Sequence, residues 1–325
     1  MTHASRTPRP HSIPLRVALA LGLVATMASH SAAEGPATDA GDDDALSIVS
    51  SDGRTFPAGT GDTGGSPSFA GTGVLPEGQR RPWSAPPEGL RPMEAGFGRS
   101  VLGTDQRTMV ADTTVFPYRA IAYLAIDFPD STGWLCTGFF IDANTIATAG
   151  HCVYSISEGG WATAITAYPG RNGAQVPYGS ASATAFYAVK AWRDHEDHRF
   201  DFGAFDIDAD LGTTTGWFGY AAGSDTDLAG FKAKIYGYPS DKGGTTMWGM
   251  QRKLKGTGAR KVFYSIDTFG GQSGSPVFGP LSPDCKPCAI GIHAYGKGIQ
   301  PFPSSNSGTR IIQDVLDKLT TWSAP

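Results

Sequence analysis

Three short motifs carry a serine, a histidine and an aspartate that could together perform nucleophilic catalysis. Ser273 lies between small residues in the segment Gly-Gly-Gln-Ser-Gly-Ser-Pro of residues 270–276, where a proline closes the turn. His151 follows a Thr-Ala-Gly segment, and Asp201 opens an Asp-Phe-Gly-Ala-Phe segment. A serine attacks a carbonyl carbon well only when a base takes its proton, and a histidine does this when a buried carboxylate fixes its tautomer. The motifs therefore predict Ser273 as nucleophile, His151 as base and Asp201 as the carboxylate that orients the ring.

The order of the three motifs along the chain separates two classes of hydrolase. Histidine, aspartate and serine follow one another here, whereas α/β-hydrolases have the order serine, acid, histidine. Their nucleophile elbow, Gly-x-Ser-x-Gly, is also not met, because Ser275 stands where its last glycine should be. The sequence therefore argues against an α/β-hydrolase.

The turn around Ser273 also predicts an oxyanion hole. The backbone N–H groups of Gly271 and Ser273 are the expected donors to the negative oxygen of a tetrahedral intermediate. Gly271 suits this turn because glycine adopts unusual backbone angles at little cost.

Asp201 is one of several acidic residues in this part of the chain. The others are Asp194, Asp197, Asp206, Asp208 and Asp210. Asp201 is favoured because Phe202 and Gly203 follow it and open an apolar alternation that is typical of a strand.

The run Asp-His-Glu-Asp-His at residues 194–198 allows a second interpretation. Histidines and carboxylates at close spacing can ligate zinc or calcium. The plainer interpretation is a solvated polar loop before the Asp201 strand, and we favour it. We expect no metal and no cofactor in the chemistry.

The N-terminus has the pattern of an export signal. Three arginines within the first 16 residues precede a nearly uncharged apolar run at 17–29, which is too short to span a bilayer comfortably. Small residues at 31–33 fit a signal peptidase site. A membrane anchor is the alternative, but no later stretch is apolar for long enough. We expect a signal peptide over 1–33, secretion to the extracellular space and no stable membrane association.

Residues 34–99 differ in texture from the rest of the chain. Gly, Pro, Ser, Thr and Asp dominate, and aromatic residues are isolated among them. Such a segment buries too little apolar area to offset its chain entropy, so we expect a largely irregular propeptide. Residues 100–325 carry 18 Lys and Arg against 20 Asp and Glu. This near-neutral balance argues against nucleic acid or an anionic membrane as a partner.

The part after residue 100 predicts many short strands and one helix. Alternating runs at 120–126, 232–236 and 289–293 indicate strands, separated by clusters of Gly, Pro, Asn and Asp. This is an all-β pattern. Helical spacing near the C-terminus predicts one amphipathic helix with a buried stripe. The stripe consists of Ile311, Ile312, Val315, Leu316, Leu319 and Trp322.

Four cysteines all follow residue 100. Cys136 and Cys152 bracket the approach to His151, and a disulfide between them would tie a strand to the turn that presents the histidine. Loop closure on this scale is worth about 3 kcal/mol in the entropic account. Cys285 and Cys288 form C-x-x-C in a polar loop. A local disulfide is favoured for a secreted chain, over a thioredoxin-like motif without a βαβ context or a zinc site lacking two ligands.

The motifs resemble those of a known family. Thr-Ala-Gly-His-Cys, Asp-Phe-Gly-Ala-Phe and Gly-Gly-Gln-Ser-Gly-Ser-Pro-Val-Phe are similar to the chymotrypsin-fold serine peptidases, and the Gly-Gln-Ser-Gly-Ser-Pro variant resembles the bacterial glutamyl endopeptidases. Further similar segments lie at 100–103, 170–173, 237–239, 291–293 and 308–311. The resemblance implies two antiparallel Greek-key β-barrels, at 100–210 and 211–325, with the site in the cleft and a C-terminal helix outside. It also implies cleavage of polypeptides after glutamate.

The resemblance carries two specificity residues onto this sequence. The family's histidine on the strand after the nucleophile matches His293, and its hydroxyl residue five positions before the serine matches Thr268. An imidazole and a hydroxyl can both donate hydrogen bonds to a substrate carboxylate.

Two positions depart from the trypsin pattern or conflict with glutamate specificity. Asp267 stands where trypsin-like enzymes carry the carboxylate that selects Arg or Lys, and it would repel glutamate if it faced the pocket. We expect it to point elsewhere. Gln272 replaces the aspartate that pairs with the newly freed amine in trypsin-like zymogens, so activation must work differently.

Composition gives independent support for glutamate. Residues 100–325 contain 18 Asp but only two Glu, Glu158 and Glu196. About a dozen would be expected from average usage. A secreted protease attacks its own exposed loops, and depletion of the residue it cuts after would reduce that damage. Drift in composition is the alternative.

The sequence thus predicts a secreted, monomeric serine endopeptidase, activated by another protease that cuts between Arg99 and Ser100. The freed amine could then lie near the specificity pocket and add positive charge. One alternative is trypsin-like specificity through Asp267. The other is a non-catalytic binding module on a protease scaffold.

Overall fold

A computed structural model describes residues 1, 42–56, 65–76, 87–93 and 100–324. The expected signal peptide lies outside the described residues apart from Met1. The described residues from 42 onward belong to one compact unit. Within the described ranges, no helix is both long and apolar enough to cross a membrane.

The first barrel is a closed ring of six antiparallel strands. In ring order β10, β11, β6, β5, β4 and β9 are neighbours, and β9 pairs back onto β10. The strands are β4 (Ile121–Asp127), β5 (Trp134–Phe140), β6 (Thr145–Thr148), β9 (Ala164–Pro169), β10 (Ala181–Val189) and β11 (Gly203–Ile207). The strand predicted at 120–126 is confirmed as β4. A two-stranded hairpin of β7 (Tyr154–Ser155) and β8 (Gly160–Trp161) lies between β6 and β9 in the chain.

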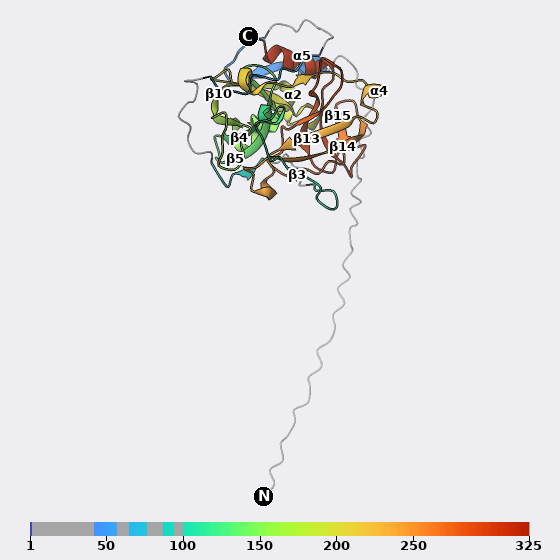
Figure 1. Cartoon of the computed structure of the whole chain (residues 1–325). Coiled ribbons are helices and arrows are strands. Elements are labelled where there is room, and N and C mark those ends of the chain that lie inside the picture. The colour runs from blue at the N-terminus through green and yellow to red at the C-terminus, as the bar shows by residue number, and fades with distance from the viewer. Residues whose placement is uncertain (2–41, 57–64, 77–86, 94–99, 325) are drawn as a thin grey trace, which may run out of the picture. The chain divides into compact units, whose positions relative to one another are not determined.

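The second barrel repeats this closure without a sequence repeat. Its ring runs β17, β16, β13, β14, β15 and β18, and β18 pairs back onto β17. The strands are β13 (Lys232–Gly237), β14 (Trp248–Thr257), β15 (Lys261–Tyr264), β16 (Pro276–Gly279), β17 (Cys288–Tyr295) and β18 (Asn306–Arg310). Outside the ring, β3 (Thr108–Met109) pairs with β14, and β12 (Gly219–Tyr220) pairs with β17. Figure 1 shows the two barrels packed side by side. The predicted all-β fold is confirmed.

The ends of residues 100–325 cross between the barrels. β3 belongs to the second barrel, although it precedes the first in the chain. The C-terminal helix α5 (Gln313–Trp322) packs on the first barrel, where Trp322 stacks on Tyr187 at 6.0 Å between ring centroids. The predicted helical stripe is buried at five of its six positions, because Ile312 is the half-buried N-cap. Each end of this part of the chain therefore contacts the barrel that is farther from it in sequence.

The remaining α-helices are short and were not predicted from the sequence. They are α1 (Asp42–Ala45), α2 (Lys190–His195), α3 (Gly212–Thr215) and α4 (Asp225–Leu228). Each has only four to six residues, which is too few for helical periodicity to show.

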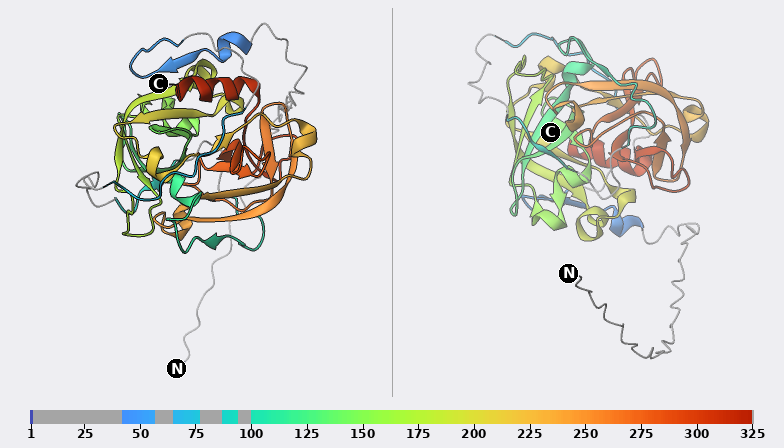
Figure 2. Two further views of the ribbon diagram at one scale, coloured as in Figure 1. Left: turned by 45° about the horizontal axis from the view of Figure 1, so that its top comes forward. Right: turned by 90° about the horizontal axis from the view of Figure 1, so that it is seen from below.

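The leader pairs with both barrels, which its composition does not indicate. β1 (Ile48–Ser50) adds to β10 as an antiparallel strand, and β2 (Arg91–Pro92) adds to β5 in parallel. Ser66 forms a bridge to Tyr220 of β12, and Phe69 forms a bridge to Trp217, which lies just before that strand. Figure 2, in its left view, shows α1 and β1 (blue) outside the first barrel, near α5. Strand pairing uses backbone groups, so a segment poor in apolar residues can still dock.

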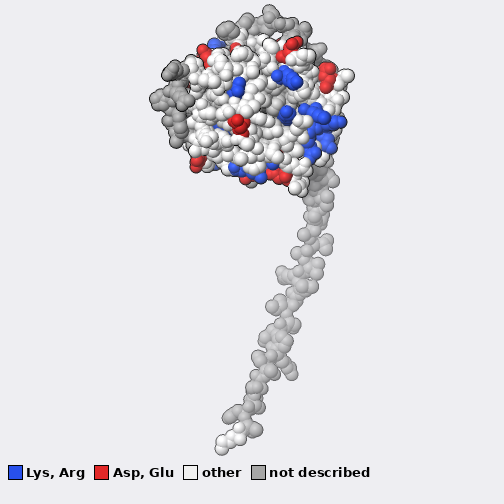
Figure 3. All heavy atoms as spheres, viewed as in Figure 1, with Lys and Arg blue, Asp and Glu red and all other residues white. Residues whose placement is uncertain are grey.

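Charge is unevenly distributed although the chain is close to neutral. Figure 3 shows Lys and Arg gathered at one edge of the visible face, where Figure 1 draws β13 and β14. These strands carry Lys232, Lys234, Arg252, Lys253 and Lys255. The near-zero net charge therefore conceals a basic patch on the second barrel.

Candidate active site

His151 lies in a short 3-10 turn that follows β6. The turn spans Gly150–Cys152, and the disulfide from Cys152 to Cys136 fastens it to β5. This bridge confirms the first predicted disulfide. It joins the strand and the turn that carry neighbouring parts of the site, so the position of His151 depends little on the surrounding loops.

Asp201 lies just before β11, next to the histidine turn. Gly203 is in register with Thr148, which brings the start of β11 beside the end of β6. The carboxylate is fully buried and accepts two hydrogen bonds from His151, one from the backbone N–H at 3.0 Å and one from Nδ1 at 2.8 Å. Burial alone would raise the pKa of Asp201, but the charge and hydrogen bond of His151 outweigh it and lower the pKa. The carboxylate is therefore ionised near neutral pH.

The loop that carries Ser273 is fixed by the first barrel. Thr137 of β5 donates its N–H to the carbonyl of Ser273 at 2.8 Å, and its hydroxyl donates to the carbonyl of Gly271 at 2.8 Å. Gly271 has φ +97°, and a Cβ there would lie 2.5 Å from the carbonyl oxygen of Tyr238. Only glycine fits this turn, as the sequence analysis expected.

The backbone N–H groups of the loop divide into two sets. Those of Gln272, Gly274 and Ser275 donate to carbonyls at 2.7 to 3.1 Å. Those of Gly271 and Ser273 have no acceptor among the residues that the structure describes. The two N–H groups expected to form the oxyanion hole are thus the two left available to bind an anion.

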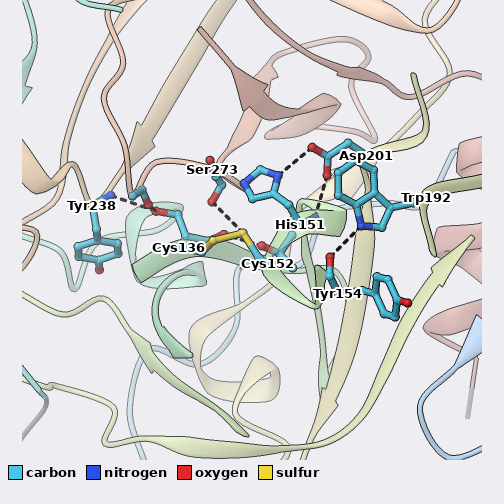
Figure 4. Close-up of a disulfide and its surroundings, with 11 residues drawn as sticks. Cys136, His151, Cys152, Tyr154, Trp192, Asp201, Tyr238 and Ser273 are labelled. Carbon is cyan, nitrogen blue, oxygen red and sulfur yellow. Dashed lines mark hydrogen bonds and ion pairs between the residues drawn. A yellow bond between two sulfur atoms is a disulfide. The ribbon is translucent and has the colours of Figure 1, made fainter. Parts of the chain in front are cut away.

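Ser273 and Asp201 lie on opposite sides of the His151 ring, as Figure 4 shows. The remaining ring nitrogen, Nε2, is buried and has no hydrogen-bond partner within the described part of the chain. With Nδ1 bound to Asp201, Nε2 is the nitrogen that can accept a proton. The structure thus pairs His151 with Asp201 and places Ser273 on the other side of the histidine ring.

Three residues behind Asp201 were not found from the sequence. Lys261 is buried, and its Nζ lies 3.3 Å from the hydroxyl of Thr309 and 4.6 Å from the centre of the Tyr295 ring. Thr309 donates to the backbone carbonyl of Asp201 at 2.8 Å. Burial lowers the pKa of Lys261 to about 8, although the negative charge of Asp201 opposes this. No local motif marks these residues, because they lie on β15, β17 and β18.

Gln272 is held by a buried arginine that precedes the first barrel. Nη1 of Arg107 donates to Oε1 of Gln272 at 3.3 Å, and the guanidinium also contacts Asp105 and Asp241. The hydrogen bond from the Arg107 guanidinium holds the pKa of Asp105 well below its usual range. A neutral glutamine beside the nucleophile is therefore satisfied without any ion pair to a terminal amine.

His293, on β17, is buried beside Tyr264 of β15. The Tyr264 hydroxyl lies 2.6 Å from Nδ1 of His293. Burial lowers the pKa of His293 to about 3 and raises that of Tyr264 well above its usual value. Both groups are consequently neutral near pH 7.

Thr268 lies at the same end of the second barrel. Asn306, which is in register with Tyr264, donates through Nδ2 to the Thr268 hydroxyl at 3.0 Å and to the carbonyl of Ser100 at 2.8 Å. The N–H of Thr268 donates to the same carbonyl of Ser100 at 3.3 Å. Asn306 therefore links Thr268 to the first residue of the expected mature chain.

The carboxylate of Asp267 is bound by the segment that follows Ser100. It accepts the N–H groups of Leu102 at 2.7 Å and Gln106 at 3.0 Å. The conflict raised by its position in the sequence is resolved, since both oxygens are engaged by the segment after Ser100.

The polar run at 194–198 is divided between two short helices. Asp194 pairs with Arg193, Glu196 accepts the N–H of Ile156, and Asp197 caps the turn His198–Phe200. Its carboxylates thus stabilise local structure.

The second predicted disulfide, Cys285–Cys288, is also confirmed.

A serine peptidase built on two β-barrels is the class that this fold and site define, and the chain belongs to the trypsin family. The family model described as Trypsin matches residues 110–303. A glutamyl endopeptidase of Bacillus licheniformis is 38% identical over 261 residues, which cover 79% of this chain and 78% of the relative. A solved structure, described as Glu endopeptidase in complex with MPD, is 32% identical with a TM-score of 0.60 and covers 70% of this chain and 100% of that chain. Within the trypsin family, the chain is a member of the glutamyl endopeptidase family, as its motifs predicted.

Another relative has a name that points to metal chemistry. A Bacillus subtilis protein named extracellular metalloprotease is 43% identical over 225 residues, 69% of this chain and 70% of the relative. Among the described residues, Cys136, His151 and Cys152 are the one group whose potential ligand atoms lie close enough for a shared metal. Both cysteines are consumed by their disulfide, and Nδ1 of His151 is bound to Asp201. This group does not fit a metal ion.

Proposed function

We propose that this serine endopeptidase is a secreted enzyme, made with a signal peptide and a propeptide, that cuts polypeptides after glutamate through a Ser273–His151–Asp201 triad. The observation that carries the proposal is the pairing of His151 with a buried, ionised Asp201 while Nε2 remains available beside Ser273. The Arg-rich start, the apolar run and the small residues at 31–33 support export.

The proposed reaction has two steps. Ser273 Oγ attacks the carbonyl carbon as His151 Nε2 takes its proton, and the negative oxygen is stabilised by the N–H groups of Gly271 and Ser273. The intermediate then collapses to an acyl-enzyme, and Nε2 gives the proton to the departing amine. Water attacks the ester in the same way, which releases the acid and restores Ser273. Asp201 stays ionised and stabilises the imidazolium.

Selection of glutamate would rest on neutral donors in a buried site. If the Tyr264 hydroxyl donates to Nδ1 of His293, the ring proton is fixed on Nε2, from which it can bind a substrate carboxylate. The Thr268 hydroxyl accepts from Asn306, so its own proton is free for the same carboxylate. The orientation of Asp267 weighs against specificity for Arg or Lys.

Removal of the leader would add a positive charge to this site. Ser100 is already buried beside Thr268 and Asn306 in the uncut chain. Oδ1 of Asn306 is buried and has no partner among the described residues, so it could accept a freed amine at Ser100. The amine would be largely protonated near neutral pH.

A cleavage-site profile on denatured proteins tests the substrate class. We expect cuts after glutamate, with chromogenic substrates ending in Glu hydrolysed and those ending in Arg not. Cuts after Arg or Lys would overturn the glutamate specificity, and failure of correctly processed protein to react with a fluorophosphonate probe would overturn catalysis through Ser273.

A further inference from the structure

Arg171 is a fully buried arginine in the loop after β9, and part of its guanidinium is unused. Nε donates to the carbonyl of Gly173 at 3.0 Å, and Nη1 donates to the carbonyl of Pro87 at 3.0 Å. Nη2 is buried without a hydrogen-bond partner in the described part of the chain. The guanidinium carbon lies 4.2 Å from the centre of the Tyr123 ring, which holds it in place. A buried donor without an acceptor lowers the stability of the folded protein, so we expect this group to bind an acceptor at some stage.

The group that Arg171 holds in the uncut chain belongs to the leader. The hydroxyl of Tyr123 donates to the same Pro87 carbonyl at 3.0 Å, so two donors converge on one oxygen. Burial raises the pKa of Tyr123 to about 12, against the effect of Arg171, so the hydroxyl keeps its proton and remains a donor. When the leader departs, both donors lose this acceptor.

The leader continues from Pro87 along the edge of β5. The N–H of Arg91 donates to the carbonyl of Gly133 at 2.9 Å, and the N–H of Met93 donates to the carbonyl of Leu135 at 3.0 Å. Met93 is buried, and Leu90 is half-buried against the same core. Residues 87–93 thus occupy a peptide-binding edge through backbone bonds, which is strand addition.

This edge adjoins the loop that carries the nucleophile. Leu135 lies two residues before Thr137, whose N–H binds the carbonyl of Ser273. Cδ2 of Leu135 is 2.9 Å from the position that a Cβ on Gly271 would take. Tyr123 is in register with Thr137, so the two side chains share one face of the sheet. The edge is therefore beside the proposed oxyanion hole, on the side of the first barrel.

In a bound substrate, the residues before and after the scissile bond extend from Ser273 in different directions. The proposed pocket for the acyl side chain, with Thr268 and His293, is on the second barrel. The leaving half would then extend toward the first barrel, along the edge of β5 that the leader occupies. We infer that Leu135, Tyr123 and Arg171 form a leaving-group subsite that binds an acidic residue a few positions after the scissile bond, and that the leader fills this subsite until it is removed.

The donor geometry favours a carboxylate over a single carbonyl. Once Pro87 departs, Nη1 and Nη2 of Arg171 are both unpaired, and a guanidinium edge with two donors matches a carboxylate bidentately. The Tyr123 hydroxyl supplies a third donor. A lysine or an apolar residue at this position would leave these donors unsatisfied.

The inference rests on the proposed function, and paired substrates separate the two. Enzyme processed from the folded full chain is given peptides with one glutamate and, at each of the second to fourth leaving positions in turn, Asp, Asn or Lys. The chromogenic Glu substrate, which has no leaving-group residues, is the reference. We expect Asp to exceed Asn by roughly ten- to hundredfold in kcat/KM at one of these positions. Absence of hydrolysis of every substrate would instead count against the proposed function.

Two variants assign the preference to the named side chains. Arg171→Met should abolish the ratio of Asp to Asn peptides, and Tyr123→Phe, which deletes one hydroxyl, should reduce it. Because each result is a ratio within one preparation, partial loss of folded enzyme cancels. A wild-type enzyme indifferent to Asp at all three positions, or an unchanged ratio in a folded Arg171→Met or Tyr123→Phe variant, overturns the subsite.

Discussion

The carboxylate of Asp267 accepts the backbone N–H of Leu102 at 2.7 Å, which makes it a structural residue. Asp267→Ala removes the acceptor of this N–H and of that of Gln106. We expect a loss of about 1–3 kcal/mol in the free energy of unfolding for each donor left unpaired. In the Asp267→Ala variant, the ratio of kcat/KM for Glu substrates to that for Arg substrates should not rise. Asp284→Ala, which removes an exposed aspartate, is the matched control. Loss of cleavage after Arg in the Asp267→Ala variant would instead show that Asp267 contributes to the specificity pocket.

Ser273→Ala deletes the proposed nucleophile and almost no packing. We expect kcat to fall on the order of a million-fold, as in comparable enzymes, while the melting temperature stays close to that of the wild type. Stopped assays with a Glu substrate and circular dichroism measure the two quantities. Retention of even a tenth of the activity would exclude Ser273 as the nucleophile.

His293→Ala should weaken catalysis on Glu substrates without unfolding the enzyme. Removal of one donor to a desolvated carboxylate costs about 2–5 kcal/mol in kcat/KM. Tyr264→Phe is the subtler companion, because it removes only the hydroxyl that lies against Nδ1. It should lower the same constant by less. An unchanged preference for Glu in both variants would remove this pair from the specificity site.

The low pKa of His293 predicts how stability depends on pH. Because burial lowers this pKa to about 3, the unfolded chain takes up a proton below pH 6.5 that the folded chain does not. The stabilisation is complete above pH 6.5 and declines as the pH falls toward 3, by about 1.4 kcal/mol per pH unit. Urea unfolding of Ser273→Ala, with and without His293→Gln, measures it. A double variant with the same slope between pH 6 and 4 would assign the effect to other groups.

Maturation should leave Ser100 as the first residue, because Ser100 is already seated beside Thr268 and Asn306. N-terminal sequencing of active enzyme checks the cut after Arg99. An extension of one or two residues should depress kcat/KM for Glu substrates, since the added residues displace the amine. Full activity with such an extension would show that the α-amine of Ser100 does not contribute to glutamate specificity.

The sequence predicted the candidate site better than it predicted what surrounds it. His151, Asp201 and Ser273 lie in compact motifs, and local sequence is enough to recognise them. Tyr264 and Lys261 act through contacts between strands far apart in the chain, which no local pattern records. Arg171 lies in a segment whose similarity to the family was noted, but its contacts with Tyr123 and Pro87 could not be read from that segment. The leader was expected to be largely irregular, because its contacts with β10 and β5 are made by backbone groups that composition does not reveal.

The contacts of residues 102–107 bear on how quickly activity could appear. In the uncut chain Asp267 already binds Leu102, and Arg107 already holds Gln272. The loop that carries Ser273 therefore has its supports before any peptide bond is broken. Activation would involve no slow ordering of this loop, so activity should rise in step with cutting and leader departure, without a lag.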